Sequence, residues 1–147
     1  MRCSRTVLSL LSLAVAFGAP AEAQQTPPPP PGAYDAAPYL GQVRNEVLFG
    51  DIWERPGLSK RDRSLVTIAV NQAQYATEEI RLHVERGLDN GLTQNEIAEL
   101  IAHVLVYSGF PTGVNAARAA TEVFRARGLP AQPAGSTPRN REPVAPP

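Results

Sequence analysis

Between residues 40 and 128, apolar side chains recur every three or four positions, in segments separated by helix-breaking residues. This spacing is typical of amphipathic helices, because positions i, i+3, i+4 and i+7 share one helix face. Residues 65–70 are β-branched enough to suggest a strand, but their polar continuation favours a helix. The pattern predicts an all-α domain of four or five helices, at about residues 40–50, 59–73, 77–90, 93–108 and 112–128.

Residues at the helix ends support these boundaries. Ser59 and Thr93 are each followed three positions later by a carboxylate, which is the pattern of an N-terminal capping box. Gly91, after an asparagine, and Gly109, before Phe-Pro, are expected to end the third and fourth helices. The helix at 59–73 carries apolar residues on several faces, so we expect it to be the buried central helix of the core.

The N-terminal end, residues 1–23, has the order of a secretory signal peptide. Arg2 and Arg5 precede an apolar run that leads to Ala-Glu-Ala at positions 21–23. The run is shorter than the roughly 20 apolar residues that a membrane span requires. We therefore expect a mature protein that is periplasmic or secreted and that does not associate with a membrane.

Two proline-rich segments flank the helical region. Residues 24–38 contain five consecutive prolines, which favour an extended linker. Residues 129–147 have few apolar side chains to offset the entropy of ordering them, so this tail is expected to be disordered. Residues 39–128 remain as the folded domain, small enough that self-association would help to stabilise it.

Cysteine and charge exclude several classes of function. Cys3 is the only cysteine and lies inside the expected signal peptide, so the mature chain would hold no disulfide, thiolate metal site or cysteine nucleophile. The 14 basic and 14 acidic residues would become 12 and 13 once Arg2, Arg5 and Glu22 are removed. This balance offers no basic excess for nucleic acid.

The candidate chemistry centres on two histidines, His83 and His103, because their unperturbed pKa values lie near neutrality. Glu79 precedes His83 by four residues, so the two side chains share one helix face and can touch. His103 stands four residues before Tyr107 on the next predicted helix. A cleft between these helices would gather all four residues into a site for acid-base chemistry.

Structural readings of the same residues stay open. Glu79 and His83 would also fit an ordinary surface pair, and His103 would fit a hydrogen bond within a subunit interface. A metal site of Glu79, His83 and His103 lacks the two histidines four residues apart that mark a zincin, so no metal is assigned. Trp53, on the loop before Ser59, fits a packing anchor or a lid over a substrate.

Several motifs in series resemble the carboxymuconolactone decarboxylase family. The resemblance covers about residues 40–124 and follows the family's order and spacing. It rests on residues 50–58 (GDIWERPGL), 63–69 (RSLVTIA), 79–83 (EIRLH), 90–93 (NGLT), 96–97 (EI), His103 and 106–111 (VYSGFP).

The resemblance implies an AhpD-like helical bundle that assembles into trimers or hexamers, with active sites near subunit contacts. The alkylhydroperoxidase branch of the family uses Cys-x-x-Cys and a histidine. Those cysteine positions fall at Ala76 and Glu79, which excludes thiol peroxidase chemistry, whereas the histidine matches His83. The decarboxylase branch removes carbon dioxide from a lactone acid and isomerises the ring without a cofactor.

That reaction suits the candidate residues. The electrons left by carbon dioxide must flow into a conjugated carbonyl, so the site needs a donor at the developing enolate oxygen and an acid for carbon. His83 and His103 would fill these roles, and Glu79 would set the tautomer of His83. Arg63 or Arg81 would hold a substrate carboxylate, although Arg63 equally fits a structural bond to a helix end or a nearby aspartate.

Export separates this chain from the family's aromatic-degradation enzyme, which works in the cytoplasm. We therefore keep two hypotheses for a partner and function. One is an exported enzyme acting on a small lactone or keto acid; the other is a non-catalytic oligomeric binding or scaffold module of the same fold. A desolvated Glu79, His83 and His103 cluster in a closed pocket would favour the enzyme.

Overall fold

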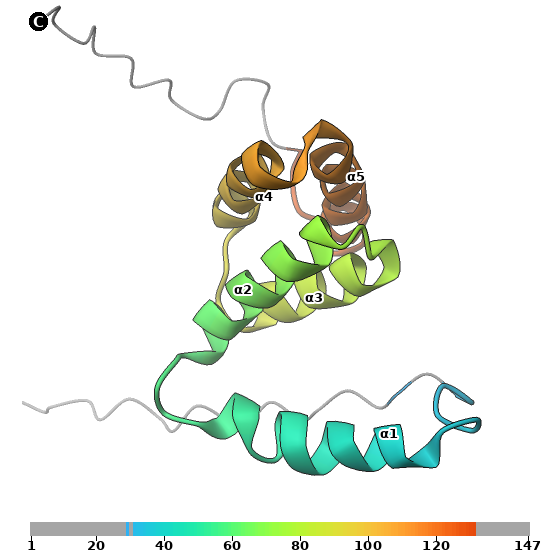
Figure 1. Cartoon of the computed structure of the whole chain (residues 1–147). Coiled ribbons are helices and arrows are strands. Elements are labelled where there is room, and N and C mark those ends of the chain that lie inside the picture. Colours follow the sequence, from blue (N-terminus) through green and yellow to red (C-terminus); the bar gives the residue numbers. More distant parts are fainter. Residues whose placement is uncertain (1–28, 30, 132–147) are drawn as a thin grey trace, which may run out of the picture. The chain divides into compact units, whose positions relative to one another are not determined.

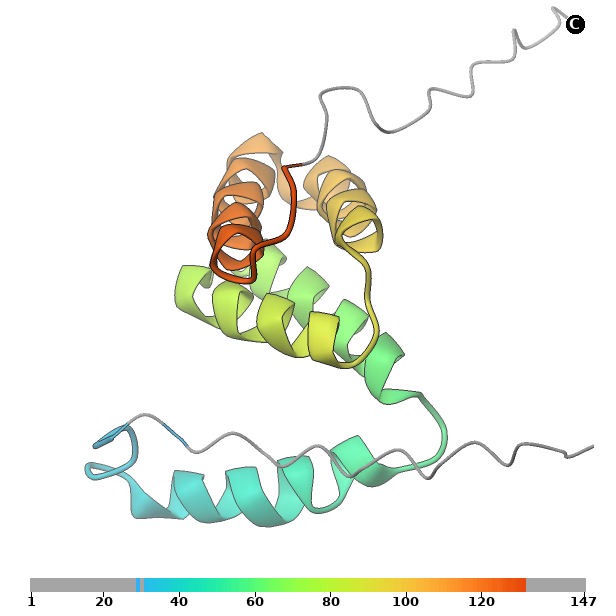
Figure 2. The ribbon, with the colours of Figure 1, turned by 180° about the vertical axis from the view of Figure 1, so that it is seen from behind.

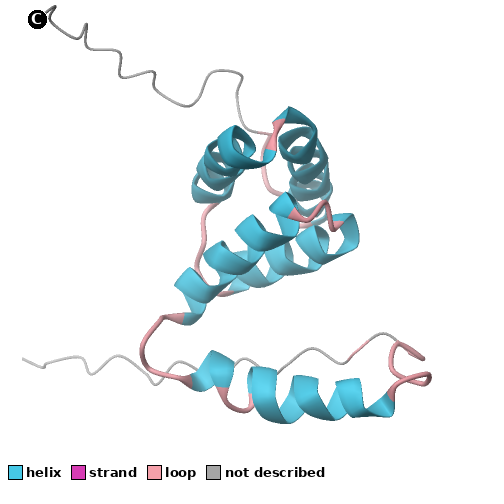
Figure 3. Ribbon diagram, viewed as in Figure 1, coloured by secondary structure: helices cyan, strands magenta, loops and turns pink. Residues whose placement is uncertain are grey.

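The computed structural model describes residue 29 and residues 31–131, and every regular element in that part of the chain is helical (Figure 3). The expected all-α class is therefore confirmed. The chain divides into two units, Met1–Ala33 and Tyr34–Pro147, and the helices of the described residues all lie in the second. The expected signal peptide, residues 24–28 and 30 of the expected linker and most of the expected tail lie outside the described residues.

In the described part of the chain, five α-helices, one π-helix and one 3-10 turn follow one another. They are α1 (Pro38–Gln42), the π-helical η1 (Val43–Phe49), the 3-10 turn η2 (Ile52–Glu54), α2 (Lys60–Ala73), α3 (Thr77–Asp89), α4 (Gln94–Ser108) and α5 (Phe110–Ala126). Figures 1 and 2 show α2 and α3 side by side as one layer, with α4 and α5 as a second layer against it.

The expected capping signals act as the sequence predicts. The Thr93 hydroxyl accepts a hydrogen bond from the backbone N–H of Glu96, whose carboxylate accepts one from the backbone N–H of Thr93. Ser59 caps α2 by accepting from the backbone N–H of Asp62. Gly91 has φ of 93°, a left-handed conformation that glycine adopts without steric penalty.

The last helix begins two residues earlier than predicted. Gly109 ends α4 as expected, but α5 starts at once at Phe110 instead of near Thr112. Pro111 does not interrupt α5, because backbone N–H groups in the first turn of a helix have no acceptor within the helix. A Gly-Phe-Pro sequence therefore ends one helix and opens the next.

The core consists of isoleucine, valine, leucine and alanine, mostly from four helices. Ile68, Ile80, Val84 and Ile97 are fully buried, and small side chains of α5 pack against them. At Gly113 an added Cβ would lie 2.7 Å from the Cβ of Leu105, so the absence of a side chain lets α5 approach α4 closely.

The prediction that α2 is buried on several faces is wrong. It buries one stripe, in which Ile68 lies between the polar Ser64 and Gln72. Gln72 donates a hydrogen bond from Nε2 to the Ile101 carbonyl at 3.1 Å. Val66 is 53% exposed, so one side of α2 stays uncovered although the helix contacts α3, α4 and α5.

Candidate functional site

His83 lies on α3 at the edge of the buried stripe that contains Ile80 and Val84. Its side chain is only 13% exposed, whereas Glu79, one turn earlier, is 58% exposed. The Nε2 atom of His83 and the Oε2 atom of Glu79 are 3.9 Å apart, beyond hydrogen-bond length. The pair thus places an imidazole at the boundary of the core and a carboxylate in solvent beside it.

Burial, together with a smaller effect of the positive charge of Arg86, lowers the pKa of His83 to about 4. His83 is therefore neutral at pH 7, and its contact with Glu79 is not an ion pair. The Nδ1 atom of His83 is buried and has no hydrogen-bond partner among the described residues. A buried polar atom without a partner is costly, so this nitrogen is suited to accept or donate a hydrogen bond to a ligand.

Arg86 lies one turn after His83 and brings a second charge to the same face of α3. Its guanidinium carbon is 4.8 Å from the ring centroid of Phe49 and 5.6 Å from that of Trp53. Burial lowers the pKa of Arg86, the nearby charge of Arg44 lowers it too, and Glu79 opposes both effects. Arg44 itself lies 4.8 Å from the Phe49 ring.

The loop that carries Trp53 is tied to α2 by polar contacts. Arg63 donates a hydrogen bond from Nη2 to the Arg55 carbonyl at 2.9 Å, and Arg55 pairs with Asp51 at 2.6 Å. Trp53 is 8% exposed and its ring centroid is 5.8 Å from that of Phe49. In the described chain, Trp53 packs as an anchor and Arg63 holds the loop backbone.

The structure places the other sequence-predicted residues away from His83. Arg81 bonds Glu122 through Nε at 2.5 Å and also bonds Glu78, and both carboxylates raise its pKa. His103 is exposed and packs against Tyr107 with the two rings tilted and their centroids 5.1 Å apart.

The expected cleft between the third and fourth helices does not gather these groups. Both α3 and α4 pack against α2 and α5. No hydrogen bond or ring contact joins His103 to Glu79 or His83 within the described residues. The physical reason is that residues four apart share a face within one helix, whereas spacing says nothing about which face the next helix turns inward.

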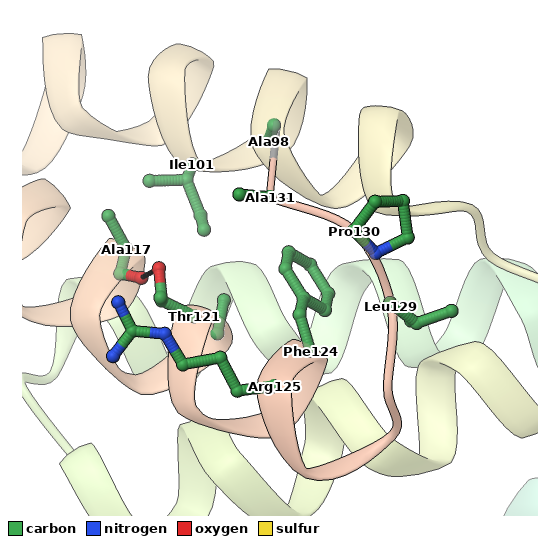
Figure 4. A pocket seen from close by; sticks show the side chains of 10 residues that line it. Ala98, Ile101, Ala117, Thr121, Phe124, Arg125, Leu129, Pro130 and Ala131 are labelled. Carbon is green, nitrogen blue, oxygen red and sulfur yellow. Dashed lines mark hydrogen bonds between the residues drawn. The ribbon is translucent and has the colours of Figure 1, made fainter. Parts of the chain in front are cut away.

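A separate groove of about 380 Å³ lies between α4 and α5. Figure 4 shows Ile101 and Phe124 reaching into it from the two helices, with the guanidinium of Arg125 at one side. None of the sequence-predicted site residues lines it. Its lining is Ala98, Ile101, Ala117, Ala120, Thr121, Phe124, Arg125, Leu129, Pro130 and Ala131.

Two observations concern the described residues as a whole. They contain no group of three or more histidine, cysteine, aspartate or glutamate side chains placed to hold a metal ion. None of their helices combines the length and apolar character that crossing a membrane would require.

Sequence reasoning missed Arg86, Arg44 and Phe49. A signal for Arg86 was present, since it follows His83 by three residues and so shares its helix face. Arg44 and Phe49 belong to the first helical segment, η1, and join the site through tertiary interactions with Arg86 on α3, which nothing in their own spacing indicates.

Comparison with known proteins identifies relatives over this region. The model of the carboxymuconolactone decarboxylase family matches residues 38–122. The chain is 43% identical over 85 residues to 4-carboxymuconolactone decarboxylase of Acinetobacter baylyi, a match that covers 58% of this chain and 63% of that protein. It is 39% identical over 75 residues to nitrosuccinic acid decarboxylase of Metarhizium robertsii, covering 51% and 52%.

A third relative, an uncharacterized 15.0 kDa protein of Paracoccus denitrificans, is 35% identical over 81 residues, covering 54% of this chain and 60% of that protein. The matches therefore span between about half and 63% of the relatives' own lengths. Glu79, His83, Arg86 and Phe49 all lie within the family match.

Proposed function

This chain belongs to the carboxymuconolactone decarboxylase family, and on that premise we propose that it is a carboxy-lyase that acts on a small carboxylic acid or lactone. Two of its relatives are named for the decarboxylation of such acids. The observation that carries the proposal is His83, a neutral, nearly buried imidazole whose Nδ1 atom has no partner among the described residues.

The reaction breaks the bond between a carboxylate carbon and its neighbour. Carbon dioxide leaves, the electron pair enters a conjugated acceptor group on the substrate, and a proton then binds the carbon. A neutral imidazole can donate an N–H hydrogen bond to the acceptor oxygen, where negative charge develops in the transition state. Burial keeps His83 uncharged until that anion forms. The hydrogen bond from His83 therefore stabilises the transition state more than the bound substrate.

Glu79 is suited to a different step. Its carboxylate is mostly exposed and lies 3.9 Å from the imidazole, so a water molecule between them could pass a proton from solvent to the site. The anion formed on the substrate raises the proton affinity of His83, which then transfers the proton to carbon. The net change is one carboxylate and one proton converted to carbon dioxide and a C–H bond.

The test is carbon dioxide release from 4-carboxymuconolactone and from nitrosuccinic acid. We expect His83→Gln, which keeps a polar side chain but cannot shuttle a proton, to lower kcat by about 10² to 10⁴. Arg125→Gln changes a charged side chain at the α4/α5 groove and serves as the matched control.

The possible outcomes separate the hypotheses. Loss of turnover in His83→Gln alone supports the proposed role. Equal turnover in His83→Gln and the wild type would remove it, and a folded wild type without turnover on either acid would favour the binding or scaffold module. His103→Gln, measured alongside, tests whether this exposed histidine contributes to the reaction.

Self-association is the second part of the proposal. Val106, Tyr107 and Phe110 are 77%, 80% and 71% exposed and lie close together where α4 ends and α5 begins. Exposed large apolar side chains grouped in this way mark interaction surfaces. Sedimentation should show the trimer or hexamer that the resemblance implies, and Phe110→Asp should shift the protein toward the monomer.

Export is the third part, and it is supported by the signal-like order of residues 1–23. Cell fractionation with and without these residues tests it. Periplasmic or secreted protein that becomes cytoplasmic on their deletion would support export, and an unchanged distribution would refute it.

A further inference from the structure

Asn90 and Gly91 form the one Asn-Gly pair of the chain, and the pair lies where α3 ends. Asparagine before glycine is the sequence that deamidates most readily in proteins, because glycine has no side chain to hinder the reaction. The backbone nitrogen of the glycine attacks the side-chain carbonyl carbon of the asparagine, ammonia leaves, and a five-membered succinimide ring forms. Water then opens the ring to give aspartate or isoaspartate.

The folded chain holds the side chain of Asn90 against another helix. Its Nδ2 atom donates a hydrogen bond to the Oγ atom of Ser64 on α2 at 2.8 Å and lies 3.5 Å from the Lys60 carbonyl oxygen. Ser64 is fully buried, and α2 packs closely against α3. The carbon that the reaction attacks is therefore fixed in place by a neighbouring helix.

The backbone nitrogen that would attack this carbon is also engaged. The N–H group of Gly91 donates a hydrogen bond to the Leu88 carbonyl at 3.1 Å. Asn90 has ψ of 6°, and ring closure requires a large rotation about this angle. That rotation would break the bond from Gly91 to Leu88. The fold thus keeps the two reacting atoms apart until the end of α3 opens.

We propose that Asn90 is a latent modification site, which the folded chain protects and which deamidates when the end of α3 opens locally. The reaction needs only water, and it replaces the amide by a carboxylate with loss of ammonia. The inference concerns the lifetime of the fold and does not depend on the proposed lyase activity. Because α3 also carries His83, each opening that leads to reaction leaves a permanent change in the helix of the candidate site.

The product should prevent the helix end from closing as before. The amide of Asn90 donates to Ser64, and the Ser64 hydroxyl in turn donates to the Lys60 carbonyl at 3.0 Å. A carboxylate at position 90 has no N–H to offer, so it would face the oxygen atoms that now accept from the amide. It would also lie at the C-terminal end of α3, where the helix dipole disfavours negative charge.

The first experiment compares the rate of modification in folded and unfolded protein. The full chain is incubated at about pH 8 in buffer and in concentrated urea, and peptides that contain residue 90 are followed by mass spectrometry. We expect deamidation at Asn90 to be at least about tenfold slower in buffer, because only the small open fraction reacts. Equal rates in buffer and in urea would overturn the inference.

A pair of variants separates local opening from global unfolding. Ser64→Ala removes the group that accepts from the Asn90 amide, whereas Gly113→Ala destabilises the packing of α4 and α5 and leaves that bond in place. Each is incubated at a temperature equally far below its own Tm. Ser64→Ala should deamidate faster than Gly113→Ala in buffer and at the same rate in urea. Equal rates in buffer would refute protection by this bond.

The effect of the product is tested by Asn90→Asp, which creates the aspartate form directly. Its Tm should fall by about 5 °C or more, because a buried polar contact is lost. Asn95→Asp is the matched control, because it places the same charge in the exposed first turn of α4, and its Tm should change little. An unchanged Tm in Asn90→Asp would contradict the proposed consequence.

Protein aged in urea gives a second measurement that requires no variant. After return to buffer, folded and unfolded molecules are separated by size and the peptides around residue 90 are analysed in each. Molecules modified at residue 90 should be depleted from the folded fraction. The same proportion of modified chains in both fractions would show that the fold tolerates the carboxylate, and would overturn the inference.

Discussion

The shifted pKa of His83 should make the stability of the fold depend on pH. The imidazole has a pKa of about 4 in the folded chain and an ordinary value of 6.5 when unfolded. As pH falls below 6.5 the unfolded chain gains a proton that the folded chain does not, so protonation favours unfolding. Stability is therefore lost between pH 6.5 and pH 4 and is retained above that window.

The magnitude follows from the difference between the two pKa values. A shift of this size lowers the free energy of unfolding by about 3 kcal/mol once the pH has fallen through both pKa values. Down to pH 5 the loss is about 2 kcal/mol. The side chain is 13% exposed, so solvent screens little of the effect. Because a domain of this size is typically stable by about 5–15 kcal/mol, the loss should be easily measured.

Urea unfolding followed by circular dichroism, at one protein concentration and at several pH values from 7.5 to 5, provides the assay. Wild type should lose about 2 kcal/mol more than His83→Gln over this range, because glutamine does not titrate. The lowered pKa values of Asp51, Glu96 and Glu122 affect stability mainly below about pH 4.5, outside the assayed pH range. Equal losses of stability in the wild type and in His83→Gln would refute the conclusion that His83 is neutral and desolvated in the folded chain.

Three further predictions concern the packing and the groove. Gly113→Ala should destabilise the fold by about 1–3 kcal/mol in thermal unfolding, because the new methyl group would meet Leu105 at 2.7 Å. Thr93→Ala should cost about 1 kcal/mol in urea unfolding, because it removes the hydroxyl that accepts from the Glu96 backbone. Ala117→Leu should partly fill the α4/α5 groove and leave carbon dioxide release unchanged; a loss of turnover would place the reaction there instead.

Local interactions made the helices of this protein predictable. The Thr93 cap and the Gly91 turn depend on residues within four positions of one another, so a single stretch of sequence contains the whole signal. The burial of α2 depends instead on what packs against it. Val66 and Val70 look like core residues in the sequence and are 53% and 47% exposed in the single chain.

In the candidate site, too, only the features that depend on local spacing could be predicted. Glu79 and His83 could be paired from their four-residue spacing, and the structure places them 3.9 Å apart. The spacing could not show that the imidazole is desolvated and the carboxylate is not, because burial depends on neighbouring helices. The sequence is equally compatible with Arg63 holding a substrate carboxylate and with Arg63 making a structural bond. Its hydrogen bond to the Arg55 carbonyl supports the structural role.

Charge and burial together distinguish Arg86 from Arg81. Both arginines lie on α3 and both are partly shielded, but the bonds of Arg81 to Glu122 and Glu78 leave little of its positive charge for a substrate. Arg86 has aromatic rings and a second cation for neighbours, so the field at His83 is positive. A positive field beside a neutral imidazole favours anionic ligands and resists premature protonation of the histidine. The same arrangement that lowers the pKa of His83 thus draws a carboxylate toward it, and an anion that binds there should raise that pKa in return.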